Sequence, residues 1–230
     1  MTENNWRSSP EVVKPLDGPG TVSRKYRIDI TKVSYREVWS WGNWFLFAGF
    51  ALRKLLGRPW YSRTLAYDPA ITILEADEVR EDLRLAILPA VSEAAACGCR
   101  VLFHYRRDPT MNVEMIAAAL MHETSLAVCL VVFAAGPILR EVSVSAISRV
   151  DARRFVATGN GVQKMITPPE IDSSSLRGAG AREILDTHMR RIAGQAITPL
   201  QDDEVKGLIL DLQTAITQAH VRRGLYVPVG

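Results

Sequence analysis

The chain has 230 residues, of which 47% are hydrophobic and 23% are charged, and both fractions are ordinary for a folded globular protein. The length fits one domain with extensions or two small domains. The net charge of +3 is too small to indicate a nucleic-acid partner. Residues 1–74 carry 11 Lys and Arg against 6 Asp and Glu, and the remaining residues carry 17 against 19, so the positive excess lies in the N-terminal third.

The cysteine content and the N-terminal residues both bear on the cellular compartment. Three cysteines, Cys97, Cys99 and Cys129, do not make the framework of a disulfide-stabilised secreted domain. The N-terminal residues lack the apolar core of a signal peptide. We therefore expect a cytoplasmic protein, with association with a membrane as the open alternative.

Two short segments come first along the chain. Residues 1–22 are rich in Pro, Gly, Ser and Asn, which predicts a disordered or loosely attached arm. Tyr26, Ile28 and Ile30 alternate with charged residues, a pattern that is typical of a short strand.

The segment between Tyr35 and Tyr61 holds four of the five tryptophans of the chain. From Val38 to Leu52 it has 15 residues without a charge. A helix that crosses a membrane needs about 20 apolar residues, so we do not expect this segment to cross one. Its apolar residues point in several directions around a helix, which is typical of a buried helix. Tryptophans followed by Arg and Lys equally suit the headgroup level of an anionic membrane. A core helix, a lipid contact and a protein contact therefore all stay open.

The candidate contact residues are the aromatic and basic side chains of this segment. The aromatic members would anchor the contact, and the basic members would attract acidic headgroups or an acidic partner. They are Trp39, Trp41, Trp44, Phe45, Phe47, Phe50, Arg53, Lys54, Arg58 and Trp60.

Three further helices are predicted. The first covers Glu75–Ala96, where apolar residues repeat at helical spacing and acidic residues occupy the first turns. Pro89 should kink this helix or split it in two, and Gly98 fits its C-terminal cap.

The other two helices lie in the C-terminal part of the chain. A loop over residues 168–180 is followed by an amphipathic helix over Ala181–Ala193. The last helix is expected to begin with Thr198 as its N-cap and Pro199 as its first residue, and to end at Gly224.

Residues 99–158 are predicted to form consecutive strands, with Val162–Ile166 pairing back after the turn Gly159-Asn160-Gly161. Short turns between successive strands indicate an antiparallel meander. The predicted fold class is α+β: an antiparallel sheet of about five meandering strands with helices packed on one face, plus an N-terminal aromatic-rich helical segment. We expect the first strand and the aromatic segment to form one unit, residues 23–66, and the α+β domain to cover residues 67–230.

Two sequence patterns invite a chemical interpretation in the predicted sheet. Cys97-Gly98-Cys99 has one residue between its thiols instead of the two of common zinc sites, so we expect no metal. His122 and Glu123 lie at a predicted hairpin turn, and neighbouring strand residues point to opposite faces, so the two side chains should not converge on a substrate.

Two more patterns belong to the predicted helix over residues 181–193. His188 lies on its apolar side, and we expect it to be half-buried and hydrogen-bonded. The run Gly178-Ala179-Gly180-Ala181 precedes the helix, where backbone N–H groups can bind an anion. It lacks the Lys-Ser/Thr pair of a phosphate loop and the preceding strand of a dinucleotide-binding turn. A flexible connection is therefore the better interpretation.

No catalytic signature stands out, so we predict a non-catalytic interaction or scaffold module. Its contact would be the tryptophan-rich segment 35–61, which would meet a protein or an anionic membrane surface. The alternative is a small-molecule-binding domain or weak enzyme, with a pocket between sheet and helices near His104, His122 or His188. No cofactor and no nucleic acid are expected. A homo-oligomer, for example through an edge strand at Leu126–Ala134, stays open.

Overall fold

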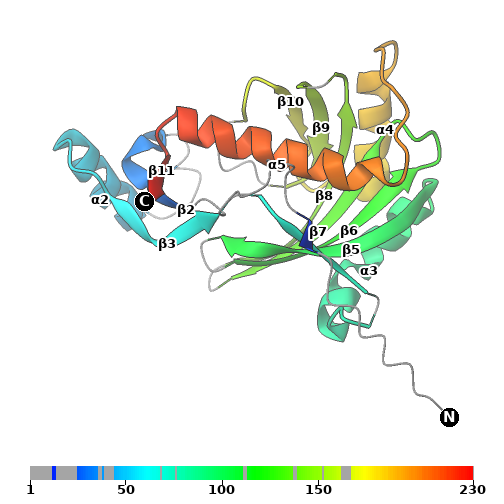
Figure 1. The fold of residues 1–230 in the computed structure, drawn as a ribbon, viewed down its shortest axis with the longest axis horizontal. Helices are drawn as coiled ribbons and strands as arrows, with labels where there is room; N and C mark the ends of the chain where they lie inside the picture. The colour runs from blue at the N-terminus through cyan, green and yellow to red at the C-terminus, as the bar shows by residue number, and fades with distance from the viewer. Residues whose placement is uncertain are drawn as a thin grey trace.

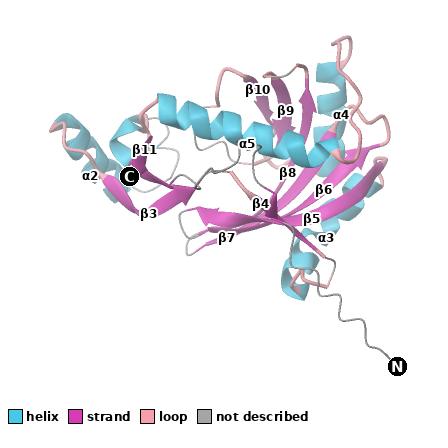
Figure 2. Ribbon diagram, viewed as in Figure 1, coloured by secondary structure: helices cyan, strands magenta, loops and turns pink. Residues whose placement is uncertain are grey.

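The computed structural model describes residues 12–13, 25–35, 38, 44–67, 69–75, 77–110, 113–136, 139–151, 153–161 and 167–229. Within these residues the fold is α+β, with one large and one small sheet (Figures 1 and 2). The large sheet has eight strands in the order β1-β4-β5-β6-β7-β8-β9-β10, and the small sheet has three in the order β11-β2-β3.

The elements have the following bounds. The strands of the large sheet are β1 (Val12–Val13), β4 (Ile71–Leu74), β5 (Cys99–Thr110), β6 (Val113–His122), β7 (Val128–Gly136), β8 (Leu139–Arg149), β9 (Phe155–Gly159) and β10 (Ile171–Ser175). Those of the small sheet are β2 (Lys25–Asp29), β3 (Tyr61–Tyr67) and β11 (Tyr226–Val229). The helices are η1 (Ile30–Lys32), α2 (Trp44–Leu55), α3 (Glu81–Ala95), α4 (Ala181–Ile192) and α5 (Glu204–Arg222).

The predicted antiparallel meander is confirmed for β5 to β9, each of which pairs antiparallel with the next. The sheet is larger than the predicted five strands, because β4 and β1 extend it at one edge and β10 extends it at the other. The loop predicted over residues 168–180 is partly wrong: residues 171–175 form β10, which pairs parallel with β9. The segment of β10 is almost entirely polar because it is an edge strand, and its sequence therefore lacks a strand signal. The predicted return strand at 162–166 lies outside the described residues.

The prediction that helices pack on one face of the sheet is wrong, because both faces are covered. On β6, Ile116, Ala118 and Leu120 pack in one core with residues of α3 and α4. The alternate residues Ala117, Ala119 and Met121 pack in a second core with residues of α5. Figure 1 shows α5 crossing the sheet face opposite α4. A strand that is buried on both sides has a continuous apolar sequence, and β6 and β7 have this property.

The helix ends differ from the prediction where tertiary hydrogen bonds hold the chain. The last helix, α5, begins at Glu204 and not near Thr198, because the Leu200 N–H donates to the Ser125 carbonyl at 2.8 Å. Helix α3 starts later than expected and continues unbroken through Pro89, which is exposed. The C-cap of α3 is Ala96 and not the predicted Gly98. Gly98 lies two residues further on, where its φ of 82° closes the turn that leads into β5.

The small sheet, η1 and α2 form a separate lobe, which we call the small lobe. Its core contains Tyr26 and Ile28, which confirms the predicted strand, together with Val33, Phe50 and Leu225. The C-terminal strand β11 pairs with β2, so the chain end belongs to this lobe. Helix α5 joins the two lobes: its N-terminal half lies in the core of the large sheet, and Val221 near its end packs in the core of the small lobe.

Candidate functional site

Helix α2 has two apolar faces, and the residues that the structure describes cover only one of them. The inner face repeats at helical spacing through Phe47, Phe50, Ala51 and Lys54, all buried or half-buried. Phe50 is 1% exposed and fills the core of the small lobe. The inner face of α2 therefore fills this core, and the opposite face of the helix lies outside it.

The uncovered face presents three leucines at the C-terminal end of α2. Leu52 is 58% exposed, Leu55 81% and Leu56 58%. Single exposed leucines are normal on a protein surface, whereas a contiguous group is a candidate contact site. We call Leu52, Leu55 and Leu56 the leucine tip. Helix α2 lies at one end of the molecule in Figure 1, beside β3.

Two arginines border the leucine tip. The guanidinium of Arg53 lies 5.2 Å from the ring centroid of Trp60, and the Trp60 ring packs against α2 where Gly49 leaves room. The chain then turns through Gly57 at a φ of 62°, and the Arg58 N–H donates to the Arg53 carbonyl at 3.1 Å. Within the described part of the chain, neither guanidinium forms a hydrogen bond or an ion pair. Both charges are therefore available to a partner.

The third cation of this turn is held inside the lobe. The Lys54 ammonium donates to the Val33 carbonyl at 2.8 Å. It also lies 4.8 Å from the ring centroid of Tyr35 and 5.2 Å from that of Phe50, so two aromatic faces stabilise its charge. Lys54 is thus a structural residue of the small lobe.

The segment of sequence that contains the tip carries charges of one sign. The sequence has no Asp or Glu from Val38 to Tyr67, where it carries Arg53, Lys54, Arg58 and Arg63. Such a surface attracts anions and repels other basic surfaces. No helix of the described residues is both long and apolar enough to cross a membrane.

The structure divides the ten predicted contact residues. Trp39 and Trp41 lie outside the described residues, and Trp44 and Phe45 belong to α2 with side chains that also lie outside the description. Arg53 and Arg58 are exposed and border the tip.

The other four predicted contact residues are not free surface groups. Phe50 is buried and Lys54 is turned inward, so both are corrected from contact to structural residues. Phe47 and Trp60 are half-buried and pack against the core of the small lobe. Sequence reasoning missed the leucines of the tip because the aromatic residues beside them gave the stronger signal. The positions i, i+3 and i+4 of Leu52, Leu55 and Leu56 were the available pattern.

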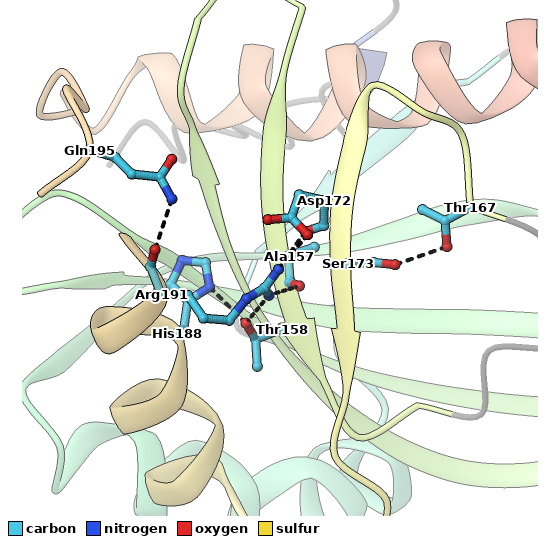
Figure 3. A network of polar contacts seen from close by, with 8 residues as sticks. All are labelled: Ala157, Thr158, Thr167, Asp172, Ser173, His188, Arg191 and Gln195. Carbon is cyan, nitrogen blue, oxygen red and sulfur yellow. Dashed lines mark hydrogen bonds and ion pairs between the residues drawn. The ribbon is translucent and has the colours of Figure 1, made fainter. Parts of the chain in front are cut away.

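A second candidate site is the polar cluster around His188, between α4 and the sheet (Figure 3). His188 is 0% exposed. Its Nε2 lies 2.8 Å from the Ser148 hydroxyl and its Nδ1 lies 3.2 Å from the Thr158 hydroxyl. The predicted hydrogen bonding of His188 is therefore confirmed, whereas the side chain is fully buried and not half-buried as predicted.

The direction of this hydrogen-bond chain follows from its two ends. The Arg191 guanidinium can only donate, and it does so to the Thr158 hydroxyl at 2.7 Å. The Leu126 carbonyl can only accept, and it does so from the Ser148 hydroxyl at 2.5 Å. Thr158 therefore donates to Nδ1 of His188, and Nε2–H of His188 donates to Ser148. Every group is satisfied when the histidine is neutral.

Burial, with a smaller effect of the nearby Arg191 charge, lowers the pKa of His188 from 6.5 to about 4. The ring is therefore neutral near pH 7, as the bonding pattern requires. Although Ser148 and His188 resemble a nucleophile and its base, the enclosed histidine cannot reach a substrate. The cluster instead fixes α4 to the sheet, where Arg191 also bonds the Ala157 carbonyl at 2.6 Å and the Asp172 carboxylate at 2.8 Å.

The glycine run before α4 does not present a free anion site. Strand β10 precedes this run in the chain, although the sequence did not predict a strand there. However, the Glu93 carboxylate accepts from the backbone N–H of Arg182 at 3.2 Å. A β-carbon added to Gly180 would meet the same carboxylate at 2.5 Å. An internal anion from α3 thus already occupies this helix N-terminus.

The remaining predicted groups do not assemble into a reaction centre. Cys99 and Cys129 are buried free thiols on β5 and β7. The hydrogen bond between the two thiols, together with burial, raises the pKa of Cys129 well above its ordinary value, so this thiol is protonated near pH 7. Among the described residues no group of three or more His, Cys, Asp and Glu is arranged to hold a metal. His122 bonds Thr124 at 2.9 Å within its own turn. His104 is half-buried, and burial lowers its pKa.

The segment proposed for edge-to-edge association is also internal. Leu126–Ala134 corresponds mostly to β7, which pairs with β6 on one side and with β8 on the other. Its backbone groups are therefore used, and it cannot pair with a second copy. No protein-family model, no curated protein and no solved structure matches the chain.

Proposed function

We propose that the protein attaches reversibly to anionic membrane surfaces through the leucine tip and its two arginines, as a non-catalytic interaction module. The observation that carries this proposal is the exposure of Leu52, Leu55 and Leu56 on a helix whose other face is already buried. A helix that is apolar on two faces needs two apolar environments. The core of the small lobe supplies one, and a partner must supply the other.

A lipid surface suits this site better than a protein surface does. The tip is formed by exposed aliphatic side chains of the helix that lies at one end of the molecule in Figure 1, whereas the centres of protein interfaces are typically rich in aromatic side chains that fill pockets. Exposed Arg53 and Arg58 flank the leucines, and an anionic leaflet attracts such cations. Their long side chains can stay at the headgroup level while the leucines enter the acyl region.

The expected affinity is that of a reversible attachment. The exposed fractions of Leu52, Leu55 and Leu56 together amount to about two fully exposed leucine side chains. Their transfer out of water contributes about 3–6 kcal/mol, and each arginine adds about 1 kcal/mol near an anionic surface. This is comparable to a single myristoyl chain, which binds membranes with a constant of about 10⁴ M⁻¹.

Co-flotation with vesicles tests the proposal. The protein should float with anionic vesicles at low salt, and less at high salt because the arginine contribution is screened. The variant L52S/L55S/L56S should remain at the bottom of the gradient. A matched control is L85S/L88S, which removes two exposed leucines of α3 and should float as the natural chain does.

Two outcomes contradict the proposal. If the natural chain does not float with anionic vesicles, the tip has no affinity for lipid and a protein contact becomes the better explanation. If the control variant loses flotation as much as the tip variant, binding depends on general surface hydrophobicity and not on this site.

A further inference from the structure

We infer that Arg53 and Arg58 bind the phosphate of lipid headgroups, with a preference for phosphate monoesters such as that of phosphatidic acid. This inference rests on the proposed membrane attachment and names the chemistry of its ligand. It concerns the two guanidiniums at the rim of the tip, which have no ion pair within the described part of the chain.

The stack on Trp60 prepares Arg53 for an oxyanion. With its central carbon 5.2 Å from the ring centroid, the guanidinium is held over the indole face, and its N–H groups lie around the edge of its plane. Those donors match two oxygens of one phosphate in a bidentate arrangement. Because the side chain is already ordered by the ring, it loses less conformational freedom on binding.

The second arginine is brought beside the first by the turn at Gly57. The bond from the Arg58 N–H to the Arg53 carbonyl closes this turn, so the two side chains start from neighbouring points of the backbone at the end of α2. A phosphate bound by both guanidiniums would accept up to four N–H groups, and more free oxygens and more negative charge favour that arrangement. A phosphate monoester has three free oxygens and a charge of about −1.5 to −2 near pH 7, whereas the phosphate of a diester lipid has two free oxygens and one charge.

The use of arginine and lysine within the same turn supports this assignment. Lys54 is committed to the Val33 carbonyl and two aromatic rings, so the exposed cations of the rim are both arginines. If only attraction to a negative surface were required, lysine would serve equally. Arginine differs from lysine in its planar set of donors, which recognises phosphate geometry.

The test compares the natural chain with R53K/R58K on two kinds of vesicle. One contains phosphatidic acid and the other phosphatidylglycerol, with the fractions adjusted to the same zeta potential. We expect the natural chain to bind the phosphatidic acid vesicles about tenfold more tightly. R53K/R58K should lose this preference and bind phosphatidylglycerol within about twofold of the natural chain, since its charge is unchanged. Both substitutions are at exposed positions and should not affect folding.

Equal binding of the natural chain to both vesicles, or an unchanged preference in R53K/R58K, overturns the phosphate inference while membrane attachment stands. Absence of flotation with either vesicle overturns both. Glycerol phosphate carries the same monoester without a lipid. Because the leucine tip contributes only to lipid binding, the natural chain should bind phosphatidic acid vesicles more tightly than it binds glycerol phosphate. Equal affinities for the two would overturn the lipid assignment.

Discussion

Acid destabilisation through His188 is the prediction that follows most directly from the structure. The folded protein holds this histidine neutral, with a pKa lowered from 6.5 to about 4 by burial and by Arg191. In the unfolded chain its pKa returns to about 6.5, so the unfolded state binds more protons between these two values. The stability contributed by the neutral ring is complete above pH 6.5 and is lost as the pH falls through this window toward 4.

The magnitude follows from the size of the shift. A difference of one pKa unit corresponds to about 1.4 kcal/mol, so the complete shift corresponds to about 3 kcal/mol. Lowering the pH from 7 to 5 covers part of the window and should reduce the unfolding free energy by about 2 kcal/mol through this group. Other titrating groups also change the unfolding free energy with pH, so the contribution of His188 must be measured as the difference between the natural chain and a variant.

His188→Gln is the matched variant, because its amide can still donate to Ser148 but cannot titrate. It should be less stable at pH 7, since the Thr158 hydroxyl loses its acceptor. Urea unfolding of both proteins at pH 7 and at pH 5 gives the four free energies required. The natural chain should lose about 2 kcal/mol more than the variant over this interval. Equal losses in the two proteins would refute the neutral, buried histidine.

The remaining stability predictions separate buried from exposed positions. Phe50→Ala should lower the unfolding free energy by about 3–5 kcal/mol, because it leaves a cavity in the core of the small lobe. Leu55→Ser should change the unfolding free energy by less than about 0.5 kcal/mol. Similar values for the two variants would contradict the assigned faces of α2. Gly159→Ala should destabilise by about 1–3 kcal/mol, because its β-carbon would lie 2.9 Å from the Val144 carbonyl oxygen. Gly207→Ala, in α5 with open space around it, should instead stabilise by about 0.5–1 kcal/mol, and thermal unfolding distinguishes these opposite signs.

The sequence predicted the central elements of the fold because their signals are local. The strands from β5 to β9 are apolar runs separated by short polar turns, and α4 has a regular apolar stripe. The start of α5 could not be predicted, since it depends on the bond from Leu200 to Ser125, two residues far apart in the chain. β10 was missed because an edge strand with polar residues resembles a loop.

The leucine tip lies in the segment that the sequence singled out, but on residues other than the predicted ones. A helix that is apolar all round does not reveal which face is buried. The choice is made by Val33 and Leu225, one before the helix and the other near the end of the chain, which close around Phe50. Since their contact is a tertiary one, the exposure of Leu55 became visible only in the fold.

The measurement that tests membrane attachment most directly is the environment of the tip on vesicles. In a Cys97→Ser background, which leaves only the buried Cys99 and Cys129, a polarity-sensitive fluorophore is attached to Leu55→Cys, or to Leu88→Cys on α3 as the control. On anionic vesicles we predict a blue shift and quenching by an acyl-chain quencher at position 55, and neither at position 88. The same response at both positions, or no response at position 55, would contradict the account.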